Sequence, residues 1–389
     1  MTRTLVYGLA RSGMAAAAAL EARGDAIVRV DRELGNEDDL SLLDGVQLVV
    51  KNPGVPGERP LVVEARALGI PVWSEVELGY RLLRPRPFIG VTGTKGKTTT
   101  SELLGAIFRA AGREVVVAGN VGRPLSAVEA PEDAWIVCEL SSFQLEDVHE
   151  LELEVAVLLN LEPDHLDRHG TFERYRDAKL RIFERARHRV VPSGSGLDGI
   201  GFSADDSLPT EPLILGRHNR GNAAAATAAA RVAGLSEDAI AEGIRTFPGV
   251  PHRLEVVRER GGVRWVNDSI ATNTFAVRRG IEAFDVPVRL ILGGRAKGED
   301  FAPFARALPP NVASIHLVGE ASDVIADALD AAGRGYDRAG TLTRAVEQAL
   351  SEAKPGDVVL LSPACASYDQ YANFEERGED FRRLVASLS

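Results

Sequence analysis

The sequence predicts an α/β protein with three doubly wound domains. The first and third are expected to be Rossmann-like, and the central one to carry a mostly parallel sheet. Nearly continuous apolar runs alternate with helical patterns along the chain, which is typical of parallel sheets covered on both faces. Proline-rich segments at residues 84–87 and 246–251 cannot continue a helix and indicate linkers. We therefore expect domains at residues 1–86, 87–249 and 250–389.

Composition narrows the class of protein and its partners. The 389 residues carry a formal net charge of −11, whereas nucleic acids and anionic membranes are normally met by basic surfaces. The two cysteines, Cys138 and Cys365, form no CxxC pair, which argues against a disulfide framework or a thiolate zinc site. No apolar run reaches the roughly 18 residues of a membrane span. We expect a cytoplasmic monomer that has neither nucleic acid nor membrane as a partner.

The first domain opens as nucleotide-binding folds do. A strand at residues 4–7 is followed by the glycine loop GLARSG at 8–13, an alanine-rich helix at 14–22 and a strand at 26–30. Asp31 then stands where a dinucleotide enzyme places its ribose-binding acid. The GxxxxG spacing differs from the GxGxxG of those enzymes, so an NAD-dependent dehydrogenase is an alternative and not the leading interpretation.

The rest of the first domain contains a loop that can be interpreted in two ways. A strand at residues 48–51 leads into NPGVP at 52–56, and a strand at 72–73 with a helix at 75–83 closes the domain. NPGVP is either a ligand loop at the edge of a parallel sheet or a plain turn.

The central domain opens with a phosphate-binding loop. The stretch TGTKGKT at residues 92–98 lies between a buried strand at 88–91 and a helix at 101–108. Gly93 and Gly96 let backbone amides turn inward around an anion, while Lys97 brings a positive charge to the outer phosphates. The Thr98 hydroxyl can hold Mg²⁺. Walker A spacing asks for a glycine where this chain has Val91, so we predict a variant P-loop ATPase domain.

Polar residues follow three further apolar strands, predicted at residues 115–118, 134–138 and 155–159. They are Asn120 after the first strand, Glu139 after the second, and Asn160 with Glu162, Asp164, His165 and Asp167 after the third. Ligands of parallel sheets collect at the carboxyl ends of strands. Glu139 directly follows five apolar residues, and we predict it as a Mg²⁺ ligand.

Two helices complete the central domain, at residues 171–187 and 223–230, with a glycine-rich segment at 193–201 between them. The first carries Lys179 among apolar neighbours. Asn219 and Asn222 precede the second and either read an adenine edge or cap the helix. The third domain has strands at 263–266, 288–292, 314–318 and 357–361, each followed by a polar or glycine-bearing loop. These loops predict a second ligand edge.

Eight motifs distributed over the whole chain resemble the Mur ligases. They are TGTKGKT (92–98), ELSSFQL (139–145), EPDHLD (162–167), AKLR (178–181), HN (218–219), PHR (251–253), NDS (267–269) and SPACAS (362–367). The phosphate loop is shared with all relatives, including folylpolyglutamate synthases, whereas SSFQ and SPACAS are typical of the members that add D-glutamate. The resemblance implies ATP-dependent amide formation, through an acyl phosphate, between UDP-N-acetylmuramoyl-L-alanine and D-glutamate in peptidoglycan precursor synthesis.

The resemblance also implies roles for single residues, matched by position. Lys97, His165 and Lys179 match catalytic residues, and Lys179 matches the lysine that family members carbamylate. Two Mg²⁺ sites are implied, one at Thr98 and Glu139 and one at His165, with carbamylated Lys179 as a further metal ligand. ATP is expected at Gly93, Thr94, Lys95, Gly96, Lys97, Thr98, Thr99, Asn222, Arg253 and Asp268. The UDP substrate is expected at Gly8, Arg11, Ser12, Asp31, Arg32, Asn52, Gly54 and Asn120. D-Glutamate is expected at Thr272, Arg295, Lys297, Ser367, Tyr368 and Phe374.

The chain departs from this pattern at one position. Many members read NDSKATN where residues 267–273 read NDSIATN, so Ile270 takes the place of a lysine. A cation that would pair with a D-glutamate carboxylate is thereby lost. We hypothesise that Arg295, close to Lys297, supplies the missing charge.

Three other classes of function are alternatives. The first is another amide ligase of the superfamily, which adds a different amino acid or extends folate. The second is a kinase or mechanical P-loop NTPase, which normally offers a strand-end aspartate and no third domain with ligand loops. The third is a non-catalytic nucleotide-sugar-binding protein, which predicts no ADP release. Lys97, Glu139 and His165 weigh against this last class.

Overall fold

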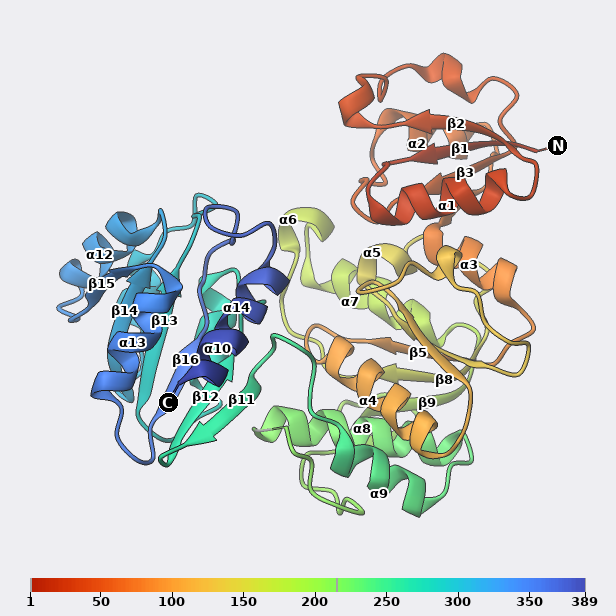
Figure 1. Ribbon diagram of the computed structural model, residues 1–389. Helices are drawn as coiled ribbons and strands as arrows, with labels where there is room; N and C mark the ends of the chain where they lie inside the picture. Colours follow the sequence, from red (N-terminus) through yellow and green to blue (C-terminus); the bar gives the residue numbers. More distant parts are fainter. Residues whose placement is uncertain (1, 215, 389) are drawn as a thin grey trace. The chain divides into compact units, whose positions relative to one another are not determined.

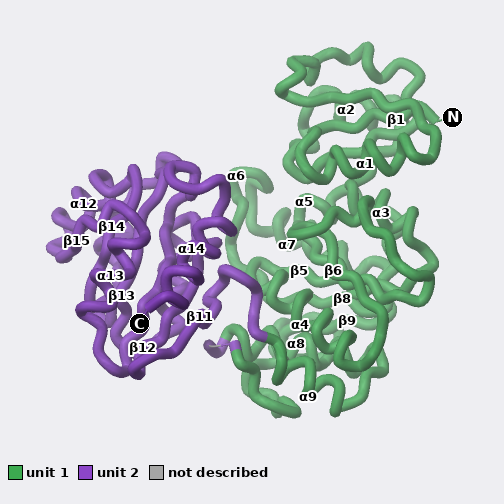
Figure 2. Tube along the Cα trace, viewed as in Figure 1, with its two compact units in different colours: residues 1–213, 218–247 green, residues 214–217, 248–389 purple. Residues whose placement is uncertain are grey.

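The computed structural model describes residues 2–214 and 216–388, which form three sheets (Figure 1). By its internal contacts the chain divides into two compact units, residues 1–213 with 218–247 and residues 214–217 with 248–389 (Figure 2). The first unit holds two of the sheets and the second unit holds one. In the described part of the chain, no helix has the length and apolar character needed to cross a bilayer.

The first sheet is wholly parallel, in the order β2-β1-β3-β4. Its strands are β1 Arg3–Tyr7, β2 Ala26–Val30, β3 Leu48–Lys51 and β4 Val72–Ser74. Its helices are α1 Arg11–Glu21, α2 Pro60–Ala67 and α3 Glu75–Leu83, with short 3-10 turns η1 Arg32–Leu34 and η2 Leu40–Leu43. Val6 of β1 packs with α1, while Leu5 and Tyr7 pack with α2. Since neighbouring residues of a strand point to opposite faces, the two helices cover opposite sides of the sheet.

Helix α1 begins at Arg11, three residues earlier than expected, so Arg11 and Ser12 belong to its first turn. Gly13 causes the difference, because a β-carbon there would lie 1.8 Å from the Gly8 carbonyl oxygen. The glycine that looked like part of a loop is the residue that allows the helix to start against the loop.

Helix α3 contributes to two cores. Leu78 packs in the core of the first sheet, whereas Val76 and Tyr80 pack with residues of the second. The expected boundary after residue 86 therefore lies inside one compact unit, and the three domain limits stay predictions.

The second sheet is also parallel throughout, in the order β10-β9-β8-β5-β7-β6. Its strands are β5 Phe88–Thr92, β6 Val115–Gly119, β7 Trp135–Glu139, β8 Leu153–Leu158, β9 Ala186–Pro192 and β10 Ile200–Phe202. Its helices are α4 Lys97–Ala110, α5 Ser142–Leu145, α6 Leu166–His169, α7 Phe172–Leu180, α8 Arg217–Val232 and α9 Glu237–Thr246, with 3-10 turns η3 Leu125–Ala127 and η4 Arg181–Phe183. The fully buried β5 lies between β7 and β8, so the phosphate loop leaves the sheet between two polar strand ends, as expected.

The helix expected at residues 171–187 is wrong in its second half. Helix α7 ends at Leu180, the turn η4 follows, and β9 pairs in parallel with β8. The charged run at 185–189 resembles a helix surface, but Val190 and Val191 are buried in the sheet. β-Branched residues with a neighbouring strand to pair with outweigh that local pattern. The glycine-rich segment at 193–201 likewise ends in the unexpected edge strand β10.

The third sheet, in the second unit, has the order β11-β12-β16-β13-β14-β15 and is parallel except for β11. Its strands are β11 Glu255–Arg260, β12 Val263–Asn267, β13 Val288–Gly293, β14 Val312–Val318, β15 Asp337–Gly340 and β16 Val358–Leu361. Its helices are α10 Thr274–Ile281, α11 Ala302–Arg306, α12 Ser322–Ala331, α13 Leu342–Glu352 and α14 Phe374–Ser387. Leu290 packs with α10 to α12, and Ile291 packs with α13 and α14. Helices thus cover both faces, and the charged antiparallel edge strand β11 was not predicted.

Candidate active site

The phosphate loop is shaped by helix α8. Gly96 precedes α4 with a left-handed backbone (φ 84°), and a β-carbon built on it would lie 2.3 Å from Asn222 Oδ1. A side chain at this position would collide with the Asn222 amide and would strain the left-handed backbone, which explains the glycine. Asn222 donates to Asn219 Oδ1 at 3.1 Å, and both residues lie inside α8. The interpretation of these asparagines as helix caps is therefore wrong.

The loop is held from the β8 side by Asn160. Its side-chain oxygen accepts the Lys95 N–H at 2.8 Å, and its amide donates to the Lys95 carbonyl at 3.1 Å. The Thr94 hydroxyl lies 2.9 Å from the Tyr175 hydroxyl and accepts the Glu162 N–H at 3.0 Å. These bonds fix the loop backbone before any phosphate binds, so its amides are preorganised.

Two lysines converge on one oxygen of this loop. Lys97 Nζ donates to the Gly93 carbonyl at 2.8 Å and to the Thr94 carbonyl at 3.0 Å, and Lys179 Nζ donates to the same Gly93 carbonyl at 2.9 Å. Lys179 is buried, and burial together with the Lys97 charge lowers its pKa to about 7. A sizeable fraction of Lys179 is therefore a neutral amine near neutral pH, which is the form that reacts as a nucleophile.

Glu139 ends β7 beside this loop and is buried, as predicted for a strand-end ligand. Its Oε1 accepts the Asn120 amide at 3.0 Å, which brings two of the expected site residues together. A buried carboxylate at a strand end beside a phosphate loop fits a hard divalent cation such as Mg²⁺.

His165 stands directly before α6 in a left-handed conformation (φ 53°, ψ 34°). Its ring lies 5.1 Å from the Phe143 ring, and its N–H donates to Asp164 Oδ1 at 3.0 Å. Asp164 also pairs with Lys95 at 3.3 Å. The turn that carries His165 is thus linked to the phosphate loop. Thr98 and Thr99 lie in the first turn of α4, which begins at Lys97 and not at residue 101 as expected.

Seven of the eight residues expected to bind UDP belong to the first sheet and its loops, whereas Asn120 follows β6 of the second sheet and bonds Glu139. Asp31 accepts the N–H groups of Leu9 (2.5 Å) and Glu33 (2.9 Å), and these bonds lower its pKa. The Asn52 amide donates to Ser12 Oγ at 2.8 Å, and Asn52 Oδ1 accepts the Gly54 N–H at 2.8 Å. NPGVP therefore forms a turn, and this turn packs on the glycine loop at the carboxyl edge of the sheet. Arg11 and Arg32, which are close in sequence to these loops, are exposed. Gly8 has a positive φ of 87°.

The second unit places Asp268 and Arg253 near one another. Asp268 is buried, accepting the Ser362 hydroxyl at 2.8 Å and the Leu254 N–H at 3.2 Å. Burial raises the pKa of Asp268 to about 7, against the opposing effects of Ser362 and the Arg253 charge. Asp268 therefore ties the end of β12 to the turn at residues 252–254 and is partly protonated at neutral pH.

The residues expected to bind D-glutamate come from loops of the same unit. Lys297 Nζ lies 3.5 Å from Thr272 Oγ1, Ser367 is buried, Tyr368 is exposed and Phe374 begins α14. Arg295 forms a two-point ion pair with Glu320, at 3.0 and 2.9 Å. The charge that we hypothesise to replace a lysine at position 270 is therefore paired with a carboxylate in this structure.

Arg377 was missed by the sequence analysis. It is buried in the first turn of α14 and donates to the Ser269 hydroxyl (2.9 Å), the Ser269 carbonyl (2.9 Å) and the Cys365 carbonyl (3.1 and 3.2 Å). Burial lowers its pKa to about 10. Arg377 thus fastens the NDSIATN loop to the SPACAS loop. No local pattern identifies it, because most arginines at the start of a helix are solvated.

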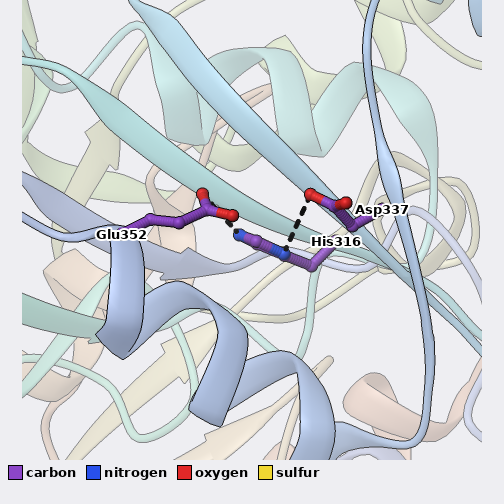
Figure 3. A group of neighbouring side chains, drawn as sticks. All are labelled: His316, Asp337 and Glu352. Carbon is purple, nitrogen blue, oxygen red and sulfur yellow. Dashed lines mark ion pairs between the residues drawn. The ribbon is translucent and has the colours of Figure 1, made fainter.

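A second polar cluster lies elsewhere in the second unit, where His316 of β14 stands between Asp337 of β15 and Glu352 of α13 (Figure 3). His316 Nδ1 is 4.0 Å from Asp337, and Nε2 is 3.7 Å from Glu352. The two carboxylates therefore flank different nitrogens, whereas one metal ion binds one nitrogen of a ring. Glu352 also pairs with Arg289 at 3.1 Å. The geometry favours a neutral buried histidine over a metal site.

This histidine should make folding sensitive to acid. Burial lowers the pKa of His316 below its ordinary 6.5, against the opposing effect of the two carboxylates. As the pH falls below about 6.5, the unfolded chain binds this proton more readily than the folded chain, so stability falls. We expect His316→Gln to flatten the decline in free energy of unfolding between about pH 7 and pH 5, measured with urea. The exposed His188→Gln is the control, and equal slopes in both variants would contradict the assignment.

Comparisons with known proteins agree with this geometry. The Mur ligase middle domain matches residues 91–195, and the Mur ligase glutamate ligase domain matches residues 252–365. The chain is 42% identical to the UDP-N-acetylmuramoylalanine–D-glutamate ligase of Desulfitobacterium hafniense strain Y51 over 441 aligned positions, covering 98% of this chain and 97% of that protein. It is 39% identical to the ligase of the same name from Acidobacterium capsulatum, covering 98% and 96%.

Among solved structures, the fold is similar to a UDP-N-acetylmuramate–alanine ligase from Thermotoga maritima. The TM-score is 0.64 at 19% identity, with 100% of this chain and 99% of that chain covered. Together, the two domain matches and the near-full-length relatives show that the chain belongs to the Mur ligase family.

Proposed function

We propose that this protein uses ATP to join D-glutamate to UDP-N-acetylmuramoyl-L-alanine. A carboxylate oxygen of the UDP-sugar peptide attacks the γ-phosphorus of ATP, and the bond to ADP breaks. The nitrogen of D-glutamate then attacks the acyl carbon, inorganic phosphate leaves, and the amine gives up its protons as the amide forms. ATP is needed because a carboxylate is too poor an electrophile for an amine at neutral pH.

One observation carries this proposal: the Lys97 ammonium is held over a preorganised phosphate loop by the carbonyls of Gly93 and Thr94. Two anions, a carboxylate and a terminal phosphate, must approach each other in the first step. The positive charge of Lys97 at that point stabilises the transition state more than the separated reactants. The family and its D-glutamate-adding relatives support the choice of amino acid.

We further propose two Mg²⁺ sites and a carbamate on Lys179. Thr98 and Glu139 would hold one ion, and His165 with the carbamate oxygens would hold the other. Mg²⁺, when bound, neutralises charge on the transferring phosphoryl group. The buried amine of Lys179, with its pKa near 7, supports this modification, because a neutral amine is the form that adds to carbon dioxide.

The remaining site residues stay proposals with the roles assigned by family resemblance. The first sheet would bind UDP. ATP would be contacted by Asn222, Arg253 and Asp268. The loops around Lys297 and Ser367 would bind D-glutamate. We also propose domains at residues 1–86, 87–249 and 250–389 and a monomeric, cytoplasmic protein. Light scattering of the purified protein tests the monomer.

ADP release over a panel of acceptors and amino acids tests the function. We expect release only when UDP-N-acetylmuramoyl-L-alanine, D-glutamate, ATP and Mg²⁺ are all present. Release with a folate acceptor, or with another amino acid in preference to D-glutamate, would assign a different amide ligase. No release with any combination would contradict the proposal.

Arg295→Ala should weaken D-glutamate binding without slowing the chemistry. We expect the KM for D-glutamate to rise about tenfold, as for a lost charge-assisted contact, with kcat within about twofold. Glu320→Gln should lower this KM, because it releases Arg295 from its ion pair. The matched control is Arg338→Ala, whose guanidinium forms a similar exposed pair with Asp323. An unchanged KM for D-glutamate in Arg295→Ala would contradict the hypothesis that Arg295 supplies the missing charge.

A further inference from the structure

Arg168, in the one-turn helix α6, forms hydrogen bonds with a loop of the first sheet. Its guanidinium donates to three consecutive carbonyls after β3, those of Val55 (2.8 Å), Gly54 (3.3 Å) and Pro53 (3.5 Å). The buried Lys51 ammonium donates to the same Val55 oxygen at 3.1 Å. A guanidinium presents five N–H donors in a fixed fork, so one arginine can hold carbonyls that one ammonium cannot span.

The loop that Arg168 contacts, residues 52–55, belongs to the proposed UDP site. Its first residue, Asn52, bonds Ser12 in the first turn of α1 at 2.8 Å. A β-carbon on Gly8 would approach Val55 Cγ2 to 2.8 Å, so the loop lies directly on the glycine loop. A nucleotide bound at these two loops would stabilise the carbonyls that Arg168 holds.

The Arg168 guanidinium also lies over the Phe143 ring of α5, with its central carbon 4.8 Å from the ring centre. This cation–π contact fixes the arginine while its N–H groups stay directed at the loop. The same ring stacks on His169 (5.0 Å between centres, 7° between planes) and contacts His165 at 5.1 Å. Phe143 is thus a shared support for Arg168 and for the proposed metal ligand His165.

His165 needs such support. A left-handed backbone is uncommon for residues with a side chain, and it persists only where surrounding contacts hold it. The His165 carbonyl accepts the N–H groups of Arg168 (3.1 Å) and His169 (3.0 Å), so the position of α6 decides where the imidazole points. An α6 released from the first sheet would leave His165 without that fixed direction.

We propose that Arg168 is a positioning residue that couples UDP-sugar binding to the metal site. The loop at residues 52–55 presents its carbonyls, Arg168 binds them and Phe143 together, and His165 is held in its left-handed turn. This proposal rests on the proposed function, because that function assigns the loop to UDP and His165 to Mg²⁺. Coupling between two ligands is reciprocal, so Mg²⁺ and the UDP-sugar should each tighten binding of the other.

The test compares Arg168→Ala with Arg176→Ala, which changes an exposed arginine of α7 whose ion-pair partner is the neighbouring Asp177, at 2.9 Å. We expect Arg168→Ala to raise the KM for UDP-N-acetylmuramoyl-L-alanine about tenfold and to raise the Mg²⁺ concentration for half-maximal rate several-fold. The KM for ATP should stay within about twofold of wild type, and Arg176→Ala should match wild type throughout. Arg168→Lys should give intermediate values of this KM and of the Mg²⁺ requirement, because lysine keeps the positive charge and lacks the planar set of N–H donors.

A binding measurement separates positioning from general damage. By calorimetry, UDP-sugar should bind wild type more tightly with Mg²⁺ than without, and this difference should disappear in Arg168→Ala. Phe143→Leu should reduce the coupling while leaving the Mg²⁺-free affinity close to wild type. If Arg168→Ala does not fold, as judged by circular dichroism, Arg168→Lys is scored by the same measurements. Wild-type coupling that persists in the folded Arg168 variants overturns the inference alone, whereas an inactive wild type overturns the proposed function.

Discussion

Lys97→Ala is expected to slow ADP release by at least about a thousandfold, the scale found when a preorganised charge is removed from a phosphoryl-transfer site. Lys97 begins α4, and its ammonium is directed back over the loop by the carbonyls of Gly93 and Thr94. The positive end of the helix and the backbone amides remain in the variant. The helix end and the amides carry only partial charges, and neither can follow the phosphoryl group as it moves to the carboxylate, as a lysine side chain can.

Binding of the UDP-sugar should survive this change within about twofold, because the proposed UDP site lies on the first sheet. A coupled assay of ADP release and calorimetry of the UDP-sugar measure the two effects separately. Lys354→Ala is the matched control, because Lys354 is exposed and its contact with Asp357 is made by its backbone N–H. A Lys97→Ala variant that keeps more than about a tenth of the wild-type rate would contradict the role assigned to this ammonium.

The sequence analysis predicted the parts of this site that depend on local pattern. The apolar strand before the loop and the helix after it identified the phosphate loop that contains Lys97, although the helix begins at Lys97 and not at residue 101. The apolar strand that ends at Glu139 placed that carboxylate at the sheet edge. Parallel topology then brings strand ends together without further information. Glu139 and Asn120, which follow neighbouring strands of the sheet, are in contact for this reason.

Contacts between distant segments could not be predicted in this way. Lys179 lies 86 residues from Gly93, and nothing in its own helix indicates that its amine reaches that carbonyl. Arg377 and Arg168 look like ordinary solvated helix residues, yet each holds several backbone carbonyls. The first two residues of β9 were assigned to the end of a helix, and the strand with its two buried valines was not predicted. In each case the tertiary partner, and not the local pattern, decides the role of the residue.

Lys179→Ala is expected to lower the rate about a thousandfold, and added acetate or formate should restore part of it. The alanine variant leaves space for a small carboxylate whose oxygens can stand in for those of the proposed carbamate. Lys97→Ala and wild type should gain nothing from the same salts. Absence of rescue in a folded Lys179→Ala variant would count against a carbamate at this position.

The pKa of Lys179 gives this prediction a pH dependence with a definite sign. Carbamate formation needs the neutral amine, and burial with the neighbouring Lys97 charge sets its pKa near 7. Acidification below that value protonates the amine, so the fraction of carbamate and the rate should both fall as the pH falls from about 8 to 6. Added bicarbonate should offset the loss, since it raises the concentration of carbon dioxide. Labelling with ¹³C-bicarbonate measures the carbamate directly: a carbamate resonance in wild type that is missing in Lys179→Ala supports the modification, and identical spectra of the two proteins would exclude it.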